Sequence, residues 1–147
     1  MKTSNILVPF EISSTSYKAF RTALDIAKEN KATLTVLTVV NSNGKEETHG
    51  FEHMLPGMVL AEYDQRRVEN EWPKLSKEAQ NMNIELNSAV LDDSYAAKGI
   101  VNFAQENKVD LIVMGNGNGK VSKECFQSSV SQEVIGLHPA CQILVVN

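Results

Sequence analysis

A run of glycines late in the sequence carries the residues best suited to hold an anion. Three glycines alternate with polar residues in the segment Gly115-Asn116-Gly117-Asn118-Gly119-Lys120. Glycine tolerates backbone conformations that bring N–H groups close to a ligand. Three serines follow at the predicted start of a helix, where hydroxyls and unpaired N–H groups suit a phosphate: Ser128, Ser129 and Ser131. The segment indicates anion binding, and a simple turn between strand and helix is the alternative interpretation.

This run matches neither of two well-known phosphate-binding loops. A P-loop needs four residues between its glycines, followed by Gly-Lys-Ser/Thr. Only three residues separate Gly115 from Gly119, and Val121 follows the lysine. A dinucleotide-binding fingerprint requires a glycine where Lys120 stands, and it follows the first strand of its fold. The sequence therefore excludes both of these motifs.

Patterns for metal binding or covalent catalysis are weaker. His49 and His53 stand four residues apart among glutamates, but Gly50 breaks the zinc-protease spacing and no third ligand is marked. We interpret this stretch as a polar loop, with a metal site as the alternative. Cys125 and Cys141 form no metal spacing. No His or Asp pattern marks Cys125 as a nucleophile, so we expect it to be an inert thiol. No Ser-His-Asp order or paired-carboxylate arrangement emerges, which argues against an enzyme.

The elements that must position these residues alternate between strand and helix. Apolar runs of strand length span Ile6 to Phe10, Thr33 to Val40, Ile84 to Leu91, Val109 to Met114 and Cys141 to Val146. Four stretches with apolar residues at helical spacing separate these runs. Crossovers of this kind join parallel strands and cover both faces of the sheet. The sequence predicts one domain over residues 1–147, with an α/β, Rossmann-like fold: a doubly wound, parallel five-stranded sheet and helices on both faces.

Residues 41 to 57 are polar and lack periodicity, and a loop of that length in a compact domain is usually functional or mobile. From Met58 to Met82 the pattern is helical, with an apolar stripe that we interpret as core or as a partner surface: Val68, Trp72, Leu75, Ala79 and Met82. Pro73 lies within this stripe and lacks a backbone donor, so we expect it to kink or divide the helix.

Ligands of open α/β sheets bind beyond the carboxyl ends of the strands, where the strand order reverses. Two strand ends carry suitable residues. Pro9, Phe10 and Glu11 follow the first strand, and Met114 with Gly115 closes the fourth. We predict a ligand site between these two strand ends.

The sequence resembles the universal stress protein family in these same segments. Its opening run is similar to that family's first strand and Pro-x-Asp-Gly-Ser motif: Ile6-Leu7-Val8-Pro9-Phe10-Glu11-Ile12-Ser13. A later run is similar to the family's Asp-Leu-Ile-Val-Met-Gly strand: Asp110-Leu111-Ile112-Val113-Met114-Gly115. Ser129 to Ser131 and His138 to Val146 resemble its last helix and strand. The resemblance covers essentially the whole chain and is least clear from residue 41 to residue 70.

The resemblance implies an adenine nucleotide, ATP with Mg²⁺, as the ligand. Nucleotide-binding members carry G-x2-G-x9-G-[S/T] after the later strand. Counting from Gly115, the second glycine of that motif falls on Asn118 and the third on Ser128, while Ser129 fits the hydroxyl position. Two hypotheses follow: weak or altered ATP binding, or a homodimeric interaction module with an empty crevice. A flavin-binding enzyme on the same sheet is a third alternative.

Further contacts are implied by family position. Glu11 stands where the family has an aspartate that holds a ribose hydroxyl, and a solvated loop acid is the alternative. Val39 corresponds to a residue that lines the adenine pocket, although core packing is the favoured interpretation. The complete set of predicted nucleotide-binding residues is Pro9, Phe10, Glu11, Val39, Met114, Gly115, Asn118, Ser128, Ser129, Val130 and Ser131.

Composition excludes several other classes of protein. The chain has 147 residues, with 14 Lys and Arg against 18 Asp and Glu, and a formal charge of −4. This acidity argues against a nucleic-acid partner, which would require a basic face. The longest apolar runs are strand-sized, so we expect neither a secretory signal nor a membrane span. The two cysteines form no disulfide framework, which favours a cytoplasmic location.

The last predicted strand suggests how the chain associates. An apolar strand at the edge of a sheet tends to pair with another chain unless it is covered. We therefore expect a homodimer through the strand from Gln142 to Val146, paired across a two-fold axis. Any ATP hydrolysis is expected to be slow, because no general base or arginine is positioned to drive phosphoryl transfer.

Overall fold

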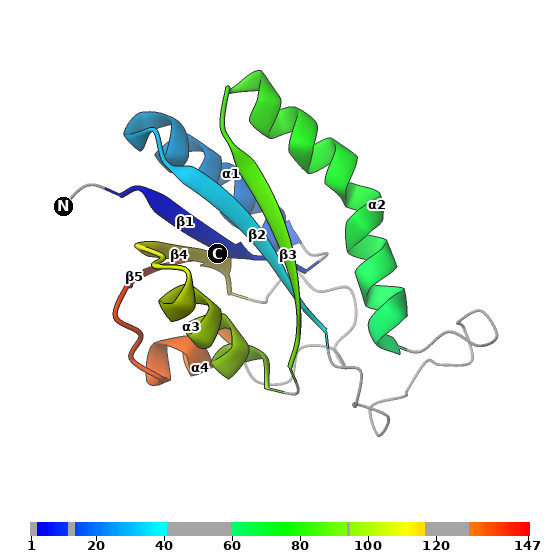
Figure 1. Cartoon of the computed structure of the whole chain (residues 1–147), viewed down its shortest axis with the longest axis vertical. Helices are drawn as coiled ribbons and strands as arrows, with labels where there is room; N and C mark the ends of the chain where they lie inside the picture. Colours follow the sequence, from blue (N-terminus) through cyan, green and yellow to red (C-terminus); the bar gives the residue numbers. More distant parts are fainter. Residues whose placement is uncertain (1–2, 12–13, 41–59, 94, 117–129) are drawn as a thin grey trace.

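The computed structural model describes residues 3–11, 14–40, 60–93, 95–116 and 130–147 (Figure 1). Strands and helices alternate along the chain as β1 (Asn5–Pro9), α1 (Ser14–Asn30), β2 (Thr33–Val40), α2 (Leu60–Asn81), β3 (Leu86–Asp92), α3 (Ala96–Glu106), β4 (Leu111–Gly115), α4 (Val130–Gly136) and β5 (Gln142–Val146). The described strands form one parallel sheet in the order β3-β2-β1-β4-β5. This order confirms the predicted doubly wound α/β fold.

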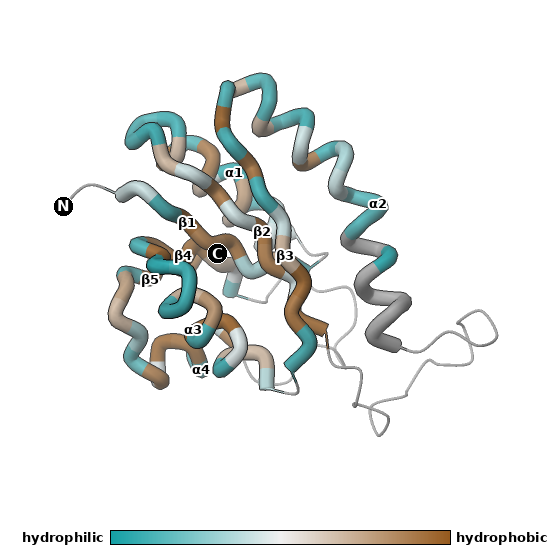
Figure 2. Tube along the Cα trace, viewed as in Figure 1, coloured by the Kyte–Doolittle hydropathy of each residue, from teal (hydrophilic) through white to brown (hydrophobic). Residues whose placement is uncertain are grey.

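Helices cover both faces of the sheet and enclose two separate apolar cores. Successive residues of a strand point to opposite faces, so Ile6 and Val8 of β1 lie in one core and Leu7 in the other. The first core is closed by α1 and α2, and the second by α3 and α4. Figure 2 shows the hydrophobic colour concentrated on the central strands, while the described part of α2 is mostly hydrophilic.

Three of the four described helices end in the same way. At the end of α1, Lys31 has a positive φ of 55°, and the N–H of Ala32 donates to the carbonyl of Ala27 at 2.9 Å. This hydrogen bond, between residues five positions apart, closes the end of the helix. The apolar residue that donates it, Ala32, directly precedes the next strand. The same arrangement ends α2 and α3. At the end of α2, Asn83 has the positive φ and the N–H of Ile84 donates to the carbonyl of Ala79. At the end of α3, Lys108 has the positive φ and the N–H of Val109 donates to the carbonyl of Ala104.

These helix ends explain where two predicted strands begin too early. Ile84 and Val109 continue the apolar pattern of the strands that follow them. Both are instead the residues that close a helix end, so β3 begins at Leu86 and β4 at Leu111. Leu137 is a further correction, since it follows the last residue of α4 and is exposed rather than packed on a helical face.

Helix α2 continues through Pro73 as one helix from Leu60 to Asn81. The expectation that Pro73 could divide the helix is therefore wrong. Pro73 is exposed, while Trp72, Leu75 and Ala79 on either side pack against the first core. This packing holds the helix together across the missing backbone donor. It also favours the core interpretation of the apolar stripe.

The pairing of the strands changes at the centre of the sheet. β1 remains paired with β2 as far as Pro9, and β4 remains paired with β5 as far as Gly115. The pairing of β1 with β4, by contrast, covers only Ile6–Leu111 and Leu7–Ile112. Toward their carboxyl ends, β1 therefore pairs only with β2, and β4 pairs only with β5. We call the carboxyl ends of β1 and β4 the switch point.

Candidate functional site

The β1 side of the switch point starts with a residue that the core holds firmly. The Phe10 N–H donates to the carbonyl of Leu37 at 2.8 Å and extends the β1–β2 ladder by one residue. Its side chain is only 4% exposed and meets the Tyr17 ring edge-on, with ring centres 5.2 Å apart. A ligand at this position would meet the backbone of Phe10 rather than its ring.

Glu11 follows with an exposed side chain. Its backbone N–H donates to the Ser16 hydroxyl at 3.3 Å, which ties the end of β1 to the first turn of α1. Glu11 therefore lies at the carboxyl end of β1, next to the start of α1. Pro9, the last residue of β1, is half-buried beside it.

On the β4 side, Gly115 lies against the start of α1. A β-carbon built at residue 115 would come within 2.6 Å of the Thr15 hydroxyl oxygen and 2.7 Å of the Thr15 carbonyl carbon. Such distances lie well inside van der Waals contact, so residue 115 must be glycine for the helix to pack here. Thr15 and Ser16 are buried polar residues at this contact. The glycine that the sequence assigns to a ligand therefore also has a packing role.

The chain leaves β4 at Asn116, which is fastened to the end of β5. The backbone N–H of Asn116 donates to the carbonyl of Val146 at 3.0 Å. Its side-chain amide nitrogen, Nδ2, donates to Oδ1 of Asn147 at 2.7 Å. Neither Asn147 nor Thr15 is among the predicted site residues. Thr15 belongs to a serine-rich stretch typical of helix starts, whereas no sequence pattern marks Asn147.

Three predicted residues from three different elements meet in the second core. Met114 of β4 is buried there, and Val39 of β2 and Val130 of α4 pack partly buried against the same cluster. Ser131 of α4 is buried as well. Val39 thus contributes to the core, as favoured, and keeps part of its side chain accessible. The remaining predicted residues, Asn118, Ser128 and Ser129, lie outside the described residues, as do residues 41 to 57, His49, His53 and Cys125.

A polar seam between α1 and α2 lies beside Phe10. Burial and a hydrogen bond to Glu71 raise the pKa of Tyr17 to about 12, so its hydroxyl stays protonated. The Lys74 ammonium lies 4.7 Å from the centre of the Tyr17 ring, at cation–π distance. Further along the seam, Arg21 pairs with Glu78 at 3.7 Å. This arginine is thereby engaged between the helices.

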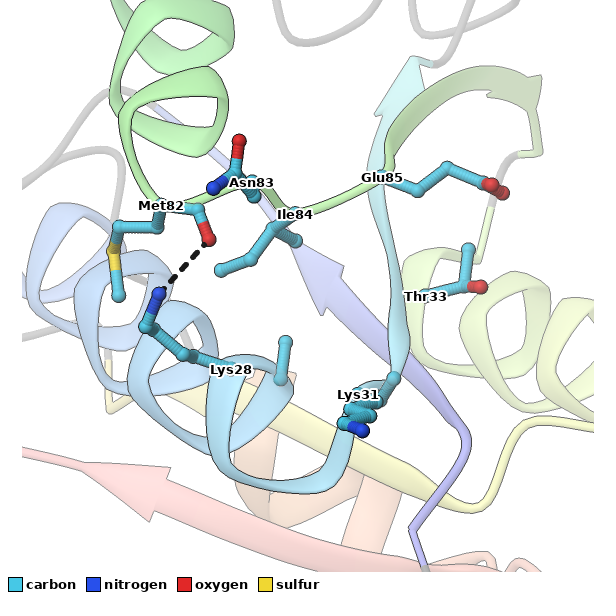
Figure 3. Close-up of a pocket in the computed structure, with 9 residues that line it drawn as sticks. Lys28, Lys31, Thr33, Met82, Asn83, Ile84 and Glu85 are labelled. Carbon is cyan, nitrogen blue, oxygen red and sulfur yellow. Dashed lines mark hydrogen bonds between the residues drawn. The ribbon is translucent and has the colours of Figure 1, made fainter.

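A depression of about 390 Å³ lies at the amino ends of the strands, where α1 and α2 end (Figure 3). Its polar contact joins the Lys28 ammonium to the carbonyl of Met82 at 3.3 Å. None of the predicted site residues lines it. Ligands of such sheets bind at the carboxyl ends of the strands. We therefore assign no ligand to this depression, which lies at the junction between the ends of α1 and α2.

In the described part of the chain, no group of three His, Cys, Asp or Glu residues could hold a metal ion. The described helices include none that is long and apolar enough to cross a membrane.

Comparisons with known proteins agree with this arrangement. The model of the universal stress protein family matches residues 2–147. A universal stress protein of Methanocaldococcus jannaschii is 30% identical over 144 residues, which cover 96% of this chain and 80% of that protein. The structure of the universal stress protein UspA from Lactobacillus plantarum is 21% identical and covers 100% of this chain and 99% of its own, with a TM-score of 0.77.

A second solved structure contains a nucleotide. It is the universal stress protein from Archaeoglobus fulgidus in complex with dAMP, which is 15% identical to this chain. The match covers 99% of this chain and 98% of that one, with a TM-score of 0.68. At this identity the likeness concerns the fold.

Proposed function

The chain belongs to the universal stress protein family, and on that premise we propose that it binds an adenine nucleotide at the switch point of its sheet. The observation that carries the proposal is the divergence of the central strands, since β1 continues with β2 and β4 with β5 beyond Leu7 and Ile112. This is the position where open α/β sheets accept ligands. The dAMP complex of a protein with the same fold supports an adenine nucleotide as the ligand class.

We assign the parts of the nucleotide to different walls of the switch point. We propose that Glu11, an exposed residue, holds a ribose hydroxyl and that the partly buried Val39 contacts adenine. The phosphates would then lie on the β4 side. The full proposed contact set is Pro9, Phe10, Glu11, Val39, Met114, Gly115, Asn118, Ser128, Ser129, Val130 and Ser131.

No arginine belongs to the proposed contact set. The three arginines of the chain, Arg21, Arg66 and Arg67, all precede β3 in the sequence, and Arg21 pairs with Glu78 at 3.7 Å. We therefore propose that backbone amides, hydroxyls and Mg²⁺ hold the phosphates of ATP. A site of this kind binds without a group that drives phosphoryl transfer, which fits a regulatory or stress-response protein with at most slow hydrolysis.

Calorimetric titration of the full chain with ATP and Mg²⁺ tests the proposal. We expect saturable heat with one site per chain, weaker binding of GTP, and a thermal stabilisation that grows with ATP concentration. An absence of both heat and thermal shift at millimolar ATP would overturn the proposal and leave the second hypothesis, an interaction module with an empty crevice.

A homodimer through β5 is the second part of the proposed function. β5 forms an edge of the described sheet, and Leu144 on it is 37% exposed. Ile135 and Leu137, in the segment that leads into β5, are 47% and 40% exposed. Pairing of two β5 strands would satisfy their outer backbone groups and cover apolar surface. A cytoplasmic location completes the proposal, because the two cysteines of the sequence form no disulfide framework.

A further inference from the structure

The carboxyl end of β4 is held by the edge strand β5 rather than by the central strand β1. β4 pairs with β5 over its whole length, from Leu111–Gln142 to Gly115–Val146. Its pairing with β1 stops three residues earlier, at Ile112. The place where β4 ends is therefore set by β5.

Asn116 continues this attachment beyond the end of the strand. Its backbone N–H is bonded to the carbonyl of Val146, and its side-chain amide to the side-chain carbonyl of Asn147. One bond fixes the position of the main chain, and the other fixes the side chain. The 2.7 Å distance of the second bond is short for an amide pair, in the range of good hydrogen-bond geometry.

Gly115 is held on its other side by α1. The contact with Thr15 leaves no room for a β-carbon, so this face of the strand end cannot move toward the helix. The strand end is thus confined between Thr15 on one side and the end of β5 on the other. The side chain of Asn147 provides the last of these contacts, through its hydrogen bond to Asn116. Asn147 is not a member of the proposed contact set.

We infer that Asn147 is a positioning residue of the nucleotide site, acting through its hydrogen bond to Asn116. The inference rests on the proposed function for its ligand, an adenine nucleoside phosphate. The bond fixes where the chain departs from β4, so the proposed phosphate contacts start from a fixed point. A hydrogen bond of this kind changes affinity by about two- to tenfold when its loss must be compensated on binding.

The position of this bond has a regulatory consequence. β5 holds Asn116 at one of its edges, and its other edge is the one proposed to pair with a second copy of the chain. We extend the inference to coupling: a change on the outer edge of β5 would reach Asn116 through these two hydrogen bonds. Nucleotide binding and the pairing of β5 would then affect each other by the same factor.

A double-mutant cycle on the full chain tests the inference. ATP affinity is measured by calorimetry for the wild type, Asn116→Ala, Asn147→Ala and the double variant. We expect each single variant to lose about two- to tenfold in affinity, and the double variant to lose no more than the weaker-binding single variant. Asn87→Ala, an exposed asparagine on β3 at the opposite edge of the sheet, is the matched control and should keep wild-type affinity.

Two further measurements separate positioning from general loss of structure. The thermal midpoint of unliganded Asn147→Ala should equal that of Asn87→Ala, and hydrogen exchange in Asn147→Ala should be faster at the Asn116 amide but not at the Val113 amide. Unchanged ATP affinity in both single variants, or additive losses in the double variant, would overturn the inference and leave the proposed function intact. Absence of ATP binding by the wild type would overturn both, and the wild-type titration alone identifies that case.

Discussion

Gly115 at the end of β4 packs directly against Thr15 in the first turn of α1, with room for a hydrogen atom but not for a β-carbon. One hundred residues separate the two in sequence. The contact fixes the start of α1 against the end of β4. Because α1 follows β1 in the chain, it also brings the ends of β1 and β4 together. It is the point at which the two walls of the proposed nucleotide site meet.

Gly115→Ala should destabilise the protein even without ligand. The added methyl group must displace the Thr15 hydroxyl and backbone, which costs about 1–3 kcal/mol for overpacking. Urea denaturation measures this loss. Gly136→Ala is the matched control, because a β-carbon there meets nothing within 4 Å. Equal stability of the two variants would show that the contact with Thr15 is not as tight as described.

Glu11→Ala should abolish discrimination for the ribose hydroxyls. If the carboxylate accepts a hydrogen bond from ribose, the wild type should bind ATP about two- to tenfold more tightly than 2′,3′-dideoxy-ATP. The variant should bind both nucleotides with equal affinity. Glu106→Ala, an exposed glutamate at the end of α3, should behave as the wild type. Retention of the preference for ATP by Glu11→Ala would assign Glu11 to the solvated-acid interpretation.

Leu144→Glu should dissociate the proposed homodimer. When two β5 strands pair across a two-fold axis, the side chains at position 144 come close together on one face of the sheet. Glutamates there would bring like charges together and remove apolar contact. Sedimentation equilibrium at micromolar concentration should show a dimer for the wild type and a monomer for the variant. Val90→Glu places the same charge on β3 at the opposite edge, where Val90 is 49% exposed, and should remain dimeric. A monomeric wild type would refute the pairing of β5.

Asp110→Asn should lower stability at neutral pH and leave it unchanged in acid. Hydrogen bonds from the backbone N–H and hydroxyl of Ser4 lower the pKa of Asp110, and the Asn5 N–H also donates to its carboxylate. Because the folded pKa is below the unfolded value of 3.8, the stabilisation is present above about pH 4 and is lost as the pH falls through the folded pKa.

The expected loss for Asp110→Asn is about 1 kcal/mol at pH 7, since the site is partly solvated and the charge is screened. Thermal denaturation from pH 2 to pH 7 should show the curves of variant and wild type converging at low pH. Asp25→Asn, an exposed aspartate on α1, should follow the wild type throughout. Parallel curves for Asp110→Asn and wild type would contradict the role of the Ser4 hydrogen bonds.

The architecture of the protein could be predicted because its signals are local. The continuous apolar run Leu111 to Met114 indicates a strand covered on both faces, and the structure buries all four residues. The sequence alone predicts that Ile84 and Val109 belong to strands, because an apolar residue that closes a helix end has the same pattern as the first residue of a strand. Hydrogen bonding distinguishes the two cases, and the sequence does not display it.

The candidate site could be predicted only in part, because its contacts join distant segments. Gly115 is prominent in the sequence as a glycine after a strand, yet its contact with Thr15 depends on how α1 crosses the sheet. Phe10 occupies a predicted ligand position, but its ring belongs to the first core. Asn147 has no pattern at all, since its role follows from the register of β4 and β5.

The central claim, that an adenine nucleotide binds between the ends of β1 and β4, is tested most directly by mapping backbone amide resonances during titration of labelled protein with ATP and Mg²⁺. We expect the changes to concentrate at Glu11, Gly115 and Asn116. The resonances of Lys31 and Asn83, which line the depression at the opposite end of the sheet, should remain unaffected. Changes confined to that opposite end, or no changes at saturating ATP, would contradict the central claim.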